Sequence, residues 1–297
     1  MLSVVIATKD RAPFVGRALD SFALQQGGAR FEVVVVDNGS RDGTAELVRG
    51  RLAAAPFPLL LAQHAQPNRG AARNVGIARA RGETILFVDD DVWAPPGFVA
   101  AHAAAHHDVS VARAVSGPIL NVPSYEVRPE PTAANFSRAF LCTCNVSVPR
   151  RALEDVGAFD EGFDLYGWED TELGLRLRRA GVRRAFDWDA YLYHIKPPQS
   201  ETLEIVGRKT VERARMAEHL LRKEPSWRAR LATGAYAANL LRASVTAPEW
   251  ALPLYAGIAK SGRIPNLLRE FARAQFLDGL YTNELRRVLR NGTQTEA

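Results

Sequence analysis

The chain has 297 residues, 47% of them hydrophobic and 24% charged, a composition that suits a globular protein and excludes a disordered or fibrous one. No stretch of about 18 uncharged apolar residues occurs, so the sequence predicts no transmembrane helix. The net charge of +5 is uneven, because residues 206–297 carry a net charge of +8 and residues 1–205 a net charge of −3.

The cellular compartment can be argued from two local features. The N-terminal apolar run is too short for a signal peptide and has no basic residues before it, so we interpret it as a strand. Cys142 and Cys144 are spaced poorly for a mutual disulfide and are too few for a zinc site, so we expect two small buried residues on one strand. Free cysteines indicate a reducing compartment. We expect a cytoplasmic protein, with peripheral attachment to the inner face of a membrane as the alternative.

The first 90 residues alternate short apolar runs with stretches of helical periodicity. The expected strands are 3–7, 31–36, 59–62 and 84–88, and the expected helices are 12–25, 44–52 and 70–80. This alternation is typical of βαβ units and predicts an α/β fold with a mostly parallel sheet. Ligands of such sheets bind beyond the carboxyl ends of the strands. The polar segments 37–43 and 89–91 follow two of the expected strands there.

The pattern becomes less regular after residue 116 and mainly helical from residue 201 onward. We expect strands at 117–121, 141–148 and 185–193, helices at 151–156 and 171–180, and a loop at 124–134. Helix breaks are expected at Pro225, Pro248, Pro253 and Pro265. The predicted organisation is a domain over 1–200, with a nucleotide half near 1–120 and an acceptor half near 121–200, followed by a helical region over 201–297.

Three consecutive carboxylates, Asp89 to Asp91, follow the strand expected at 84–88. Such neighbours repel one another and resist burial, and a bound divalent cation removes that cost. Mg²⁺ and Mn²⁺ take carboxylate and phosphate oxygens together, and Asp89 and Asp91 can point to the same side. The alternative is an acidic loop that is simply solvated.

A second polar cluster extends from Asn145 to His194. Glu169 and Asp170 stand at the start of an expected helix, where helix capping alone could account for two carboxylates. The neighbouring Gly167 and Trp168 favour more than capping, because a tryptophan can stack on a sugar ring and a nearby carboxylate can act as a general base. His194 is either a metal ligand or an ordinary core or surface histidine.

Taken together, these segments resemble glycosyltransferases of the GT-A fold and family 2 type over roughly residues 1–197. The matching stretches are 3–11, 36–44, 68–76, 87–91, and 157–161 with 167–173. The resemblance implies a Rossmann-like, mostly parallel central sheet flanked by helices, with a C-terminal helical extension. It also implies a hexosyl- or deoxyhexosyltransferase that uses a nucleotide-sugar donor and acts in glycan, cell-surface or glycoconjugate biosynthesis.

The resemblance also implies how the donor is bound. Ala7, Thr8 and Arg11 would hold the nucleobase and ribose together with Asp37 and Asn38. Many family members have two acidic residues where this chain has Asp37 and Asn38. An amide can accept the N3–H of a pyrimidine and can donate to its carbonyl, which fits uracil or thymine and leaves UDP and dTDP as alternatives.

The roles of the acidic segments follow from the same resemblance. Arg73, Asp89 and Asp90 would lie at the nucleotide, and Asp91 would be the direct ligand of Mn²⁺ or Mg²⁺, with Asp89 and His194 completing the metal site.

The acceptor half of the site is expected in the Gly-Trp-Glu-Asp segment, which is also present in galactosyltransferase-like and chondroitin-polymerase-like relatives. Asp170 would be the catalytic base of an inverting displacement, and Glu169 would contact the acceptor or donor sugar. Trp168, Gly167 and Asn145 are the expected sugar contacts. The sugar and the carbohydrate or glycoconjugate acceptor are left open.

Two other functions compete with this interpretation. A nucleotidyltransferase can share this kind of sheet, but it would favour a glycine-rich phosphate loop after the first strand, and residues 7–11 contain no glycine. A non-catalytic module that binds nucleotide-sugars or glycans is the other alternative. The acidic triplet together with Asp170 and His194 argues against it, and metal-dependent hydrolysis of the donor would separate the two.

Residues 206–290 are rich in arginine, with aromatic and leucine residues between them. Three interpretations are open: helices that pack on the catalytic domain with their arginines in solvent, an interfacial membrane contact, or a surface for homo-oligomerisation. Nucleic acid is not an expected partner, because no recognition motif accompanies the charge.

Overall fold

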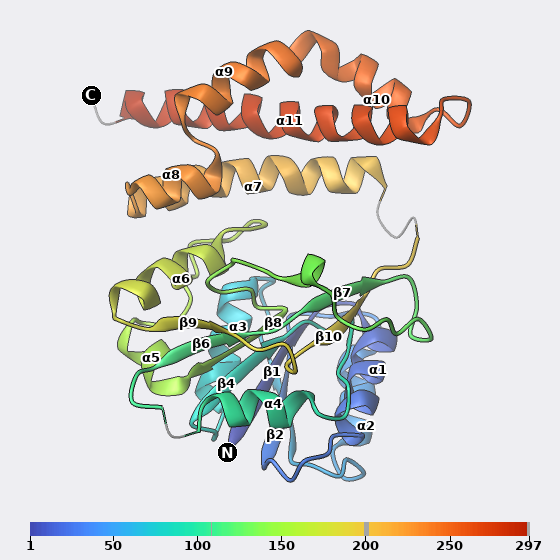
Figure 1. The fold of residues 1–297 in the computed structure, drawn as a ribbon, viewed down its shortest axis with the longest axis vertical. Helices are drawn as coiled ribbons and strands as arrows, with labels where there is room; N and C mark the ends of the chain where they lie inside the picture. Colours follow the sequence, from blue (N-terminus) through green and yellow to red (C-terminus); the bar gives the residue numbers. More distant parts are fainter. Residues whose placement is uncertain (108, 199–201, 296–297) are drawn as a thin grey trace. The chain divides into compact units, whose positions relative to one another are not determined.

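The computed structural model describes residues 1–107, 109–198 and 202–295. The chain divides into two compact units. The first comprises Met1–Asp164 and Glu169–Pro198, and the second comprises Leu165–Trp168 and Gln199–Ala297 (Figure 1). The boundary expected at residues 200 and 201 lies outside the described residues, as do residues 296 and 297. The sequence pattern did not anticipate that four residues just before Glu169 would belong with the helical unit.

A seven-stranded sheet forms the centre of the first unit, with the strand order β3-β2-β1-β4-β8-β6-β9. The first half of this unit comprises β1 (Leu2–Thr8), α1 (Ala12–Ala23), β2 (Phe31–Asp37), α2 (Thr44–Arg51), β3 (Leu59–Gln63), α3 (Arg69–Arg79) and β4 (Thr84–Val88). These four strands run parallel to one another. All seven elements agree within two residues with the bounds expected from the periodicity. The α/β class with a mostly parallel central sheet is confirmed.

Helices cover both faces of this sheet, as the alternation of buried residues along the strands requires. Val4 and Ile6 of β1 point into one core, which α1, α2 and α4 (Phe98–Ala105) close. Val5 points into the opposite core, which α3, α5 (Arg150–Asp155) and α6 (Glu169–Arg179) close. The three layers leave the carboxyl ends of β1, β2 and β4 at one edge of the sheet.

The second half of this unit departs from the expected pattern in two strands. The strand expected at 185–193 is two strands in different sheets, β9 (Arg183–Phe186) in the large sheet and β10 (Leu192–Ile195) in a small one. The strand expected at 141–148 begins only with β8 (Asn145–Pro149). Cys142 and Cys144 are free cysteines that precede this strand, so the expectation that they lie on one strand was wrong.

Several short elements had no recognisable sequence signal. They are β5 (Val92–Trp93), α4, β6 (Arg113–Ser116) and η1 (Ala133–Asn135), while β7 (Ile119–Val122) and α5 match expected elements closely. The sequence of α4 is almost all alanine and other small or apolar residues, so no polar side interrupts it to reveal the helical period. The small sheet has the order β5-β10-β7.

The regular elements that the structure describes in the second unit are all helices, as expected from residue 201 onward. Its elements are α7 (Leu203–Lys223), α8 (Trp227–Thr233), α9 (Ala237–Thr246), η2 (Glu249–Ala251), α10 (Leu252–Lys260) and α11 (Asn266–Thr295). Pro225, Pro248 and Pro265 fall between helices, as expected. Pro253 does not break a helix, because it occupies the first turn of α10, where its missing N–H has no helical partner to lose.

Candidate active site

Polar side chains gather where β1 and β4 end. Thr8 is the last residue of β1, and its buried hydroxyl donates a hydrogen bond to Oδ2 of Asp90, at 2.7 Å. Asp90 follows β4 by two residues and lies against Arg11, whose Nη1 is 3.8 Å from Asp90 Oδ1. Burial raises the pKa of Asp90 to about 7 against the lowering effect of Arg11 and Thr8. The parallel strands thus place two segments from distant parts of the sequence in direct contact.

Asp91 is the most heavily paired carboxylate of this edge. Its Oδ2 lies 2.9 Å from Arg11 Nη1 and 3.2 Å from Lys196 Nζ, and its Oδ1 lies 2.9 Å from His194 Nε2. Burial alone would raise the pKa of Asp91, but the hydrogen bond and charge of His194 and the charges of Lys196 and Arg11 hold it well below its ordinary value. Asp91 is therefore ionised and surrounded by positive charge.

His194 reaches Asp91 because β10 runs beside β5, which immediately follows the acidic triplet. His194 is paired with Val92 in that antiparallel ladder, and the N–H of Ile195 donates to the carbonyl of Asp91, at 2.7 Å. The other ring nitrogen, Nδ1, lies 3.0 Å from Asn121 Oδ1 on the neighbouring strand β7. Because an amide oxygen only accepts, Nδ1 carries a proton and donates to Asn121, and Nε2 is the ring nitrogen that faces Asp91 and can bind a cation.

The donor atoms here fit a hard divalent cation such as Mn²⁺ or Mg²⁺. Carboxylate oxygens with one imidazole nitrogen suit these ions, and neighbouring ligands of an octahedral ion lie about 3 Å apart, close to the separation of Asp91 Oδ1 and His194 Nε2. Asp89, Cys144 and His194 offer a second, overlapping set, with ligand atoms all within 4.8 Å of one another. The thiol of Cys144 was not anticipated as a candidate ligand.

Arg73 connects the acidic triplet to the start of α6. Its guanidinium lies 3.1 Å from Glu169 Oε1 through Nη1 and 3.8 Å from Asp89 Oδ1 through Nη2. Only 9% of Arg73 is exposed, and Glu169 is also buried. A buried arginine between two carboxylates is well compensated in charge, so this bridge fixes the distance between the two acidic segments.

Asp170 stands beside Glu169 in the first turn of α6 and is half-buried. Its Oδ1 accepts a hydrogen bond from the backbone N–H of Thr171, at 2.7 Å. Burial and the adjacent charge of Glu169 raise the pKa of Asp170 to about 6, although Arg73 and the Thr171 hydrogen bonds oppose the rise. A carboxylate with this pKa is ionised at neutral pH and basic enough to accept a proton.

The segment after β2 forms a compact turn next to these groups. Asp37 is buried and accepts a hydrogen bond from the N–H of Ser40, at 3.0 Å. The backbone N–H of Asn38 donates to the carbonyl of Thr8, at 2.8 Å. The side-chain oxygen of Asn38 already accepts from the N–H of Asn68, at 3.1 Å, so one lone pair and the NH₂ group are left for a ligand. Ala7, at the end of β1, is half-buried.

Asn145 does not suit the sugar contact expected for it. Its side chain is fully buried at the start of β8, where its oxygen lies 2.9 Å from His102 Nε2 and its nitrogen donates to the carbonyls of Ala190 and Pro118, at 2.8 and 3.3 Å. We correct the expectation: Asn145 is a support residue. It ties α4 and β8 to the segment that leads into β10 and so to His194.

Gly167 and Trp168 belong to the helical unit, and the structure gives them partners there. The indole N–H of Trp168 donates to the carbonyl of Arg213, at 2.7 Å, and the Arg213 guanidinium lies 4.4 Å from the centre of the ring. Trp168 is 6% exposed, so its ring has the surroundings of a core residue. Gly167 has a φ of 100°, which glycine adopts freely, whereas the φ of 75° at Trp168 is a strained conformation for a residue with a side chain.

Two further groups of the site carried no sequence signal of their own. Lys196 pairs with Asp91 from just beyond β10, and Asn121 orients the ring of His194 from β7. A lysine or an asparagine in an unremarkable segment could have been noticed only if the small sheet had been predicted, because its register brings both residues to the acidic triplet.

The described part of the chain has no helix that is both long and apolar enough to cross a membrane. Comparisons with known proteins find similar sequences and similar folds. Validoxylamine A glucosyltransferase from Streptomyces hygroscopicus subsp. jinggangensis is 31% identical over 242 residues, which cover 69% of this chain and 57% of that protein. The chain thus spans little more than half the length of this relative.

Solved structures share the fold at low sequence identity. The mannosyltransferase PcManGT from Pyrobaculum calidifontis, solved with GDP-Man and Mn²⁺, has a TM-score of 0.62 at 20% identity, over 96% of this chain and 86% of that one. S. aureus TarS 1–349 in complex with UDP-GlcNAc has a TM-score of 0.57 at 20% identity, over 98% of this chain and 92% of that one.

The expected GT-A fold is therefore confirmed. The family model described as glycosyl transferase family 2 matches residues 3–131, which include β1, the segment after β2 and the acidic triplet. Residues 3–131 thus match the glycosyl transferase family 2 model, and the chain is similar to glycosyltransferases.

Proposed function

We propose that this protein transfers a sugar from a nucleoside diphosphate donor to an acceptor hydroxyl, with inversion at the anomeric carbon and with the help of a divalent cation. The observation that carries the proposal is the pairing of Asp91 with His194 beside a second carboxylate cluster, Glu169 and Asp170, that Arg73 ties to Asp89. The first pair has the chemistry of a metal and diphosphate site. The second supplies a base of suitable pKa.

The donor would lie along the carboxyl ends of β1, β2 and β4. Thr8, Asp37 and Asn38 line the place where a base and ribose would rest, and the free NH₂ group of Asn38 can donate to a carbonyl of uracil or thymine. We therefore favour UDP- or dTDP-sugars. Solved proteins of this fold have been captured with GDP-Man and with UDP-GlcNAc, so the fold itself does not fix the base.

Asp91 and His194, with Asp89, would hold the cation. When bound, Mn²⁺ or Mg²⁺ supplies positive charge that offsets the negative charge developing on the diphosphate leaving group. Arg11 and Lys196 contact the same Asp91 carboxylate, and both are positioned to donate hydrogen bonds to phosphate oxygens. Their positive charge would favour binding of the donor even if phosphate oxygens replaced Asp91 as the partner of one of them.

Asp170 would act as the general base. It would accept the proton of the acceptor hydroxyl while that oxygen attacks the anomeric carbon, and the bond from this carbon to the diphosphate oxygen would break on the opposite face. One such displacement inverts the configuration. Glu169, held by Arg73, would contact the sugar and keep a negative charge beside Asp170 that raises its basicity.

Release of the nucleotide from a panel of UDP-, dTDP-, GDP- and CDP-sugars tests the proposal. We expect one donor to be hydrolysed or transferred only when Mn²⁺ or Mg²⁺ is present. Asp170→Asn should lower turnover by at least 100-fold. Asp155→Asn is the matched control, because Asp155 is exposed and pairs with Arg151 on the surface. Metal-dependent binding of a nucleotide without any turnover would instead support a non-catalytic binding module.

A further inference from the structure

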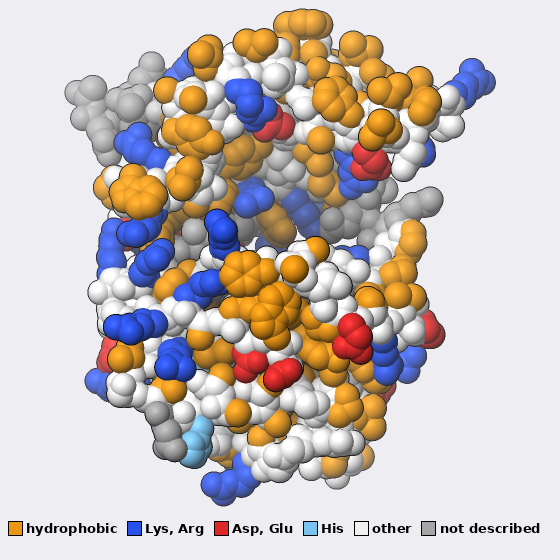
Figure 2. Space-filling view, viewed as in Figure 1, with side chains coloured by type: hydrophobic (Ala, Val, Ile, Leu, Met, Phe, Trp, Pro, Cys, Tyr) orange, Lys and Arg blue, Asp and Glu red, His pale blue; other side chains and the backbone are white. Residues whose placement is uncertain are grey.

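The helical unit exposes an unusual amount of apolar surface. Six large side chains form three pairs at i, i+4 spacing: Leu241 and Val245 on α9, Trp250 and Leu254 across η2 and α10, and Leu267 and Phe271 on α11. Each of them is between 57% and 82% exposed. Residues four apart lie on the same side of a helix, so each pair is a short apolar stripe. Figure 2 shows hydrophobic side chains crowded over α9 and α10. We call these six residues the apolar face.

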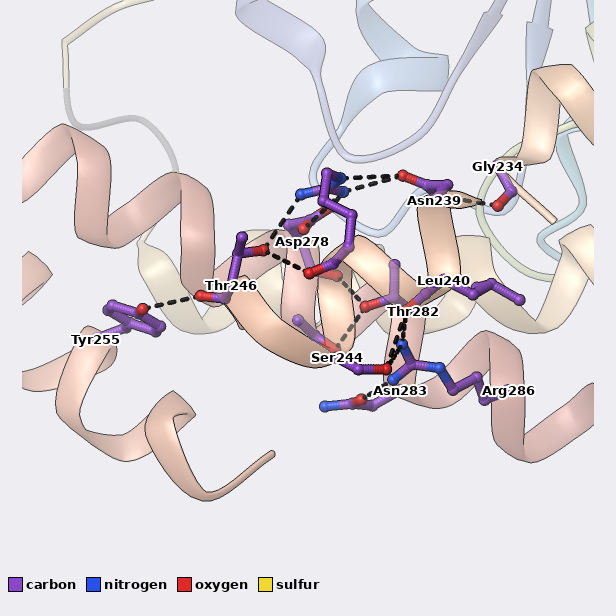
Figure 3. A network of polar contacts seen from close by, with 12 residues as sticks. Gly234, Asn239, Leu240, Ser244, Thr246, Tyr255, Asp278, Thr282, Asn283 and Arg286 are labelled. Atoms are coloured by element: carbon purple, nitrogen blue, oxygen red, sulfur yellow. Dashed lines mark hydrogen bonds and ion pairs between the residues drawn. The ribbon is translucent and has the colours of Figure 1, made fainter. Parts of the chain in front are cut away.

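A polar network on the inner side of α9 explains why its stripe faces outward. Arg242 pairs with Asp278 of α11, with 3.0 Å between Nη2 and Oδ1. Arg286, also on α11, donates to the carbonyl of Leu240 and to the hydroxyl of Ser244 (Figure 3). The hydroxyl of Tyr255 on α10 donates to the carbonyl of Thr246, at 2.9 Å. These contacts fix how α9 is rotated against α10 and α11, so the exposure of Leu241 and Val245 is built into the fold.

The charges around the apolar face are mainly positive. Residues 227–248 contain three arginines and no acidic residue, and residues 249–271 contain Lys260, Arg263 and Arg269 against Glu249 and Glu270. Arg228 and Arg263 are exposed. An apolar and positively charged surface of this kind is complementary to a partner that has an apolar interior and a negatively charged outer layer.

We propose that the apolar face docks on the surface of an anionic lipid bilayer. Leucine, valine and phenylalanine side chains gain by entering the boundary of the acyl chains, a tryptophan such as Trp250 favours the headgroup level, and arginines attract anionic headgroups. A second copy of this chain is less favoured as the occupant, because two such surfaces would bring their arginines together. The inference is independent of the proposed sugar transfer, since every residue it uses lies in the helical unit.

Flotation of the full chain with lipid vesicles tests this directly. We expect it to float with vesicles of phosphatidylcholine mixed with phosphatidylglycerol, and to bind vesicles of phosphatidylcholine alone at least tenfold more weakly. Binding should weaken as the salt concentration rises, because salt screens the attraction between arginines and headgroups.

Variants assign the binding to the apolar face. The double variant Leu241→Ser and Val245→Ser, and separately Trp250→Ala, should each weaken vesicle binding at least tenfold and keep the circular dichroism spectrum of the parent. Leu24→Ser is the matched control, because Leu24 is 54% exposed in the first unit, and it should bind vesicles as the parent does. Arg228→Gln with Arg263→Gln should reduce binding to the anionic vesicles selectively.

Three results would overturn the proposal. The first is no flotation with either kind of vesicle. The second is equal binding of the parent and of both apolar variants. The third is a dimer in sedimentation equilibrium that the double variant abolishes in the absence of any vesicle binding, which would make a second copy of the chain the occupant.

Discussion

The Nε2 atom of His194 lies 2.9 Å from Oδ1 of Asp91, although His194 is on β10 and Asp91 lies just before β5, in a distant part of the chain. The contact depends on β10 pairing with β5 on one side and β7 on the other. Asn121 orients the ring from β7, which leaves Nε2 directed at the carboxylate. The small sheet thus serves to bring a histidine to the acidic triplet.

Replacing His194 by alanine should weaken the binding of Mn²⁺ by at least tenfold, because an imidazole ligand is lost while Asp89 and Asp91 remain. Titration calorimetry with Mn²⁺ measures this without any need for turnover. His107→Ala is the matched control, because His107 is exposed at the end of α4. Unchanged Mn²⁺ affinity in His194→Ala would remove this residue from the metal site.

The pH dependence of turnover should follow Asp170. Its pKa is raised to about 6, so the fraction of ionised base, and with it kcat, should rise through pH 6 and level off near pH 7 to 8. A rate profile measured at saturating donor and metal tests this. A profile that is flat from pH 5 to 8 would contradict the assignment of Asp170 as the base.

The same shift has a consequence for stability. The pKa of Asp170 in the folded protein, about 6, lies above the ordinary value of an aspartate, so between about pH 4 and 6 the folded protein holds a proton that the unfolded chain has released. The free energy of unfolding therefore falls as the pH rises through this window. Asp170→Asn removes the buried charge, and we expect a higher melting temperature than the parent at pH 7, together with the loss of turnover. Asp155→Asn should change neither property.

Arg73 should matter for both folding and catalysis. Arg73→Met leaves Glu169 buried without its partner and should lower the free energy of unfolding by about 3 kcal/mol. Arg73 also lowers the pKa of Asp170, so its removal should move the acid limb of the rate profile to higher pH. Denaturant unfolding and the rate profile measure the two effects. A destabilised variant with an unshifted profile would show that Arg73 is only a structural residue.

Cys144 should make the metal site sensitive to thiophilic ions. Its sulfur lies within 4.8 Å of the ligand atoms of Asp89 and His194, and a set of sulfur, nitrogen and oxygen donors favours Zn²⁺ over Mn²⁺. We expect Zn²⁺ to displace Mn²⁺, and Cys144→Ser to weaken Zn²⁺ binding at least tenfold with little change for Mn²⁺. Cys142→Ser is the control, because Cys142 is half-buried and does not belong to this set of ligand atoms. Equal Zn²⁺ affinity in both variants would place the ion elsewhere.

The first half of the fold could be predicted from the sequence because its strands and helices carry strong periodic signals. The run from Ser3 to Ala7 and the one from Thr84 to Val88 are largely buried on both faces, and α1 and α3 between them show clear apolar sides. The strand order then places Thr8 and the acidic triplet at one edge. The positions of the candidate nucleotide and metal residues follow from this pattern and from the family resemblance.

The second half could not be predicted in the same way because its elements are short and depend on tertiary contacts. The run 185–193 has the composition of one strand, yet a turn divides it between two sheets. Asn145 illustrates the consequence for the site. In the sequence, Asn145 is the first residue of the second polar cluster. Its partner His102, however, lies on α4, an alanine-rich helix without a periodic signal. Without α4, a buried structural asparagine cannot be told from a sugar contact.

Binding of nucleotides tests the central claim most directly. The melting temperature of the protein should be measured with UDP, dTDP, GDP and CDP, each with and without Mn²⁺, for the parent and for Asp91→Asn. We predict that UDP or dTDP raises the melting temperature of the parent only when Mn²⁺ is present, and that the substitution abolishes this increase. An absence of any increase with all four nucleotides, or an increase that needs neither Mn²⁺ nor Asp91, would contradict the account.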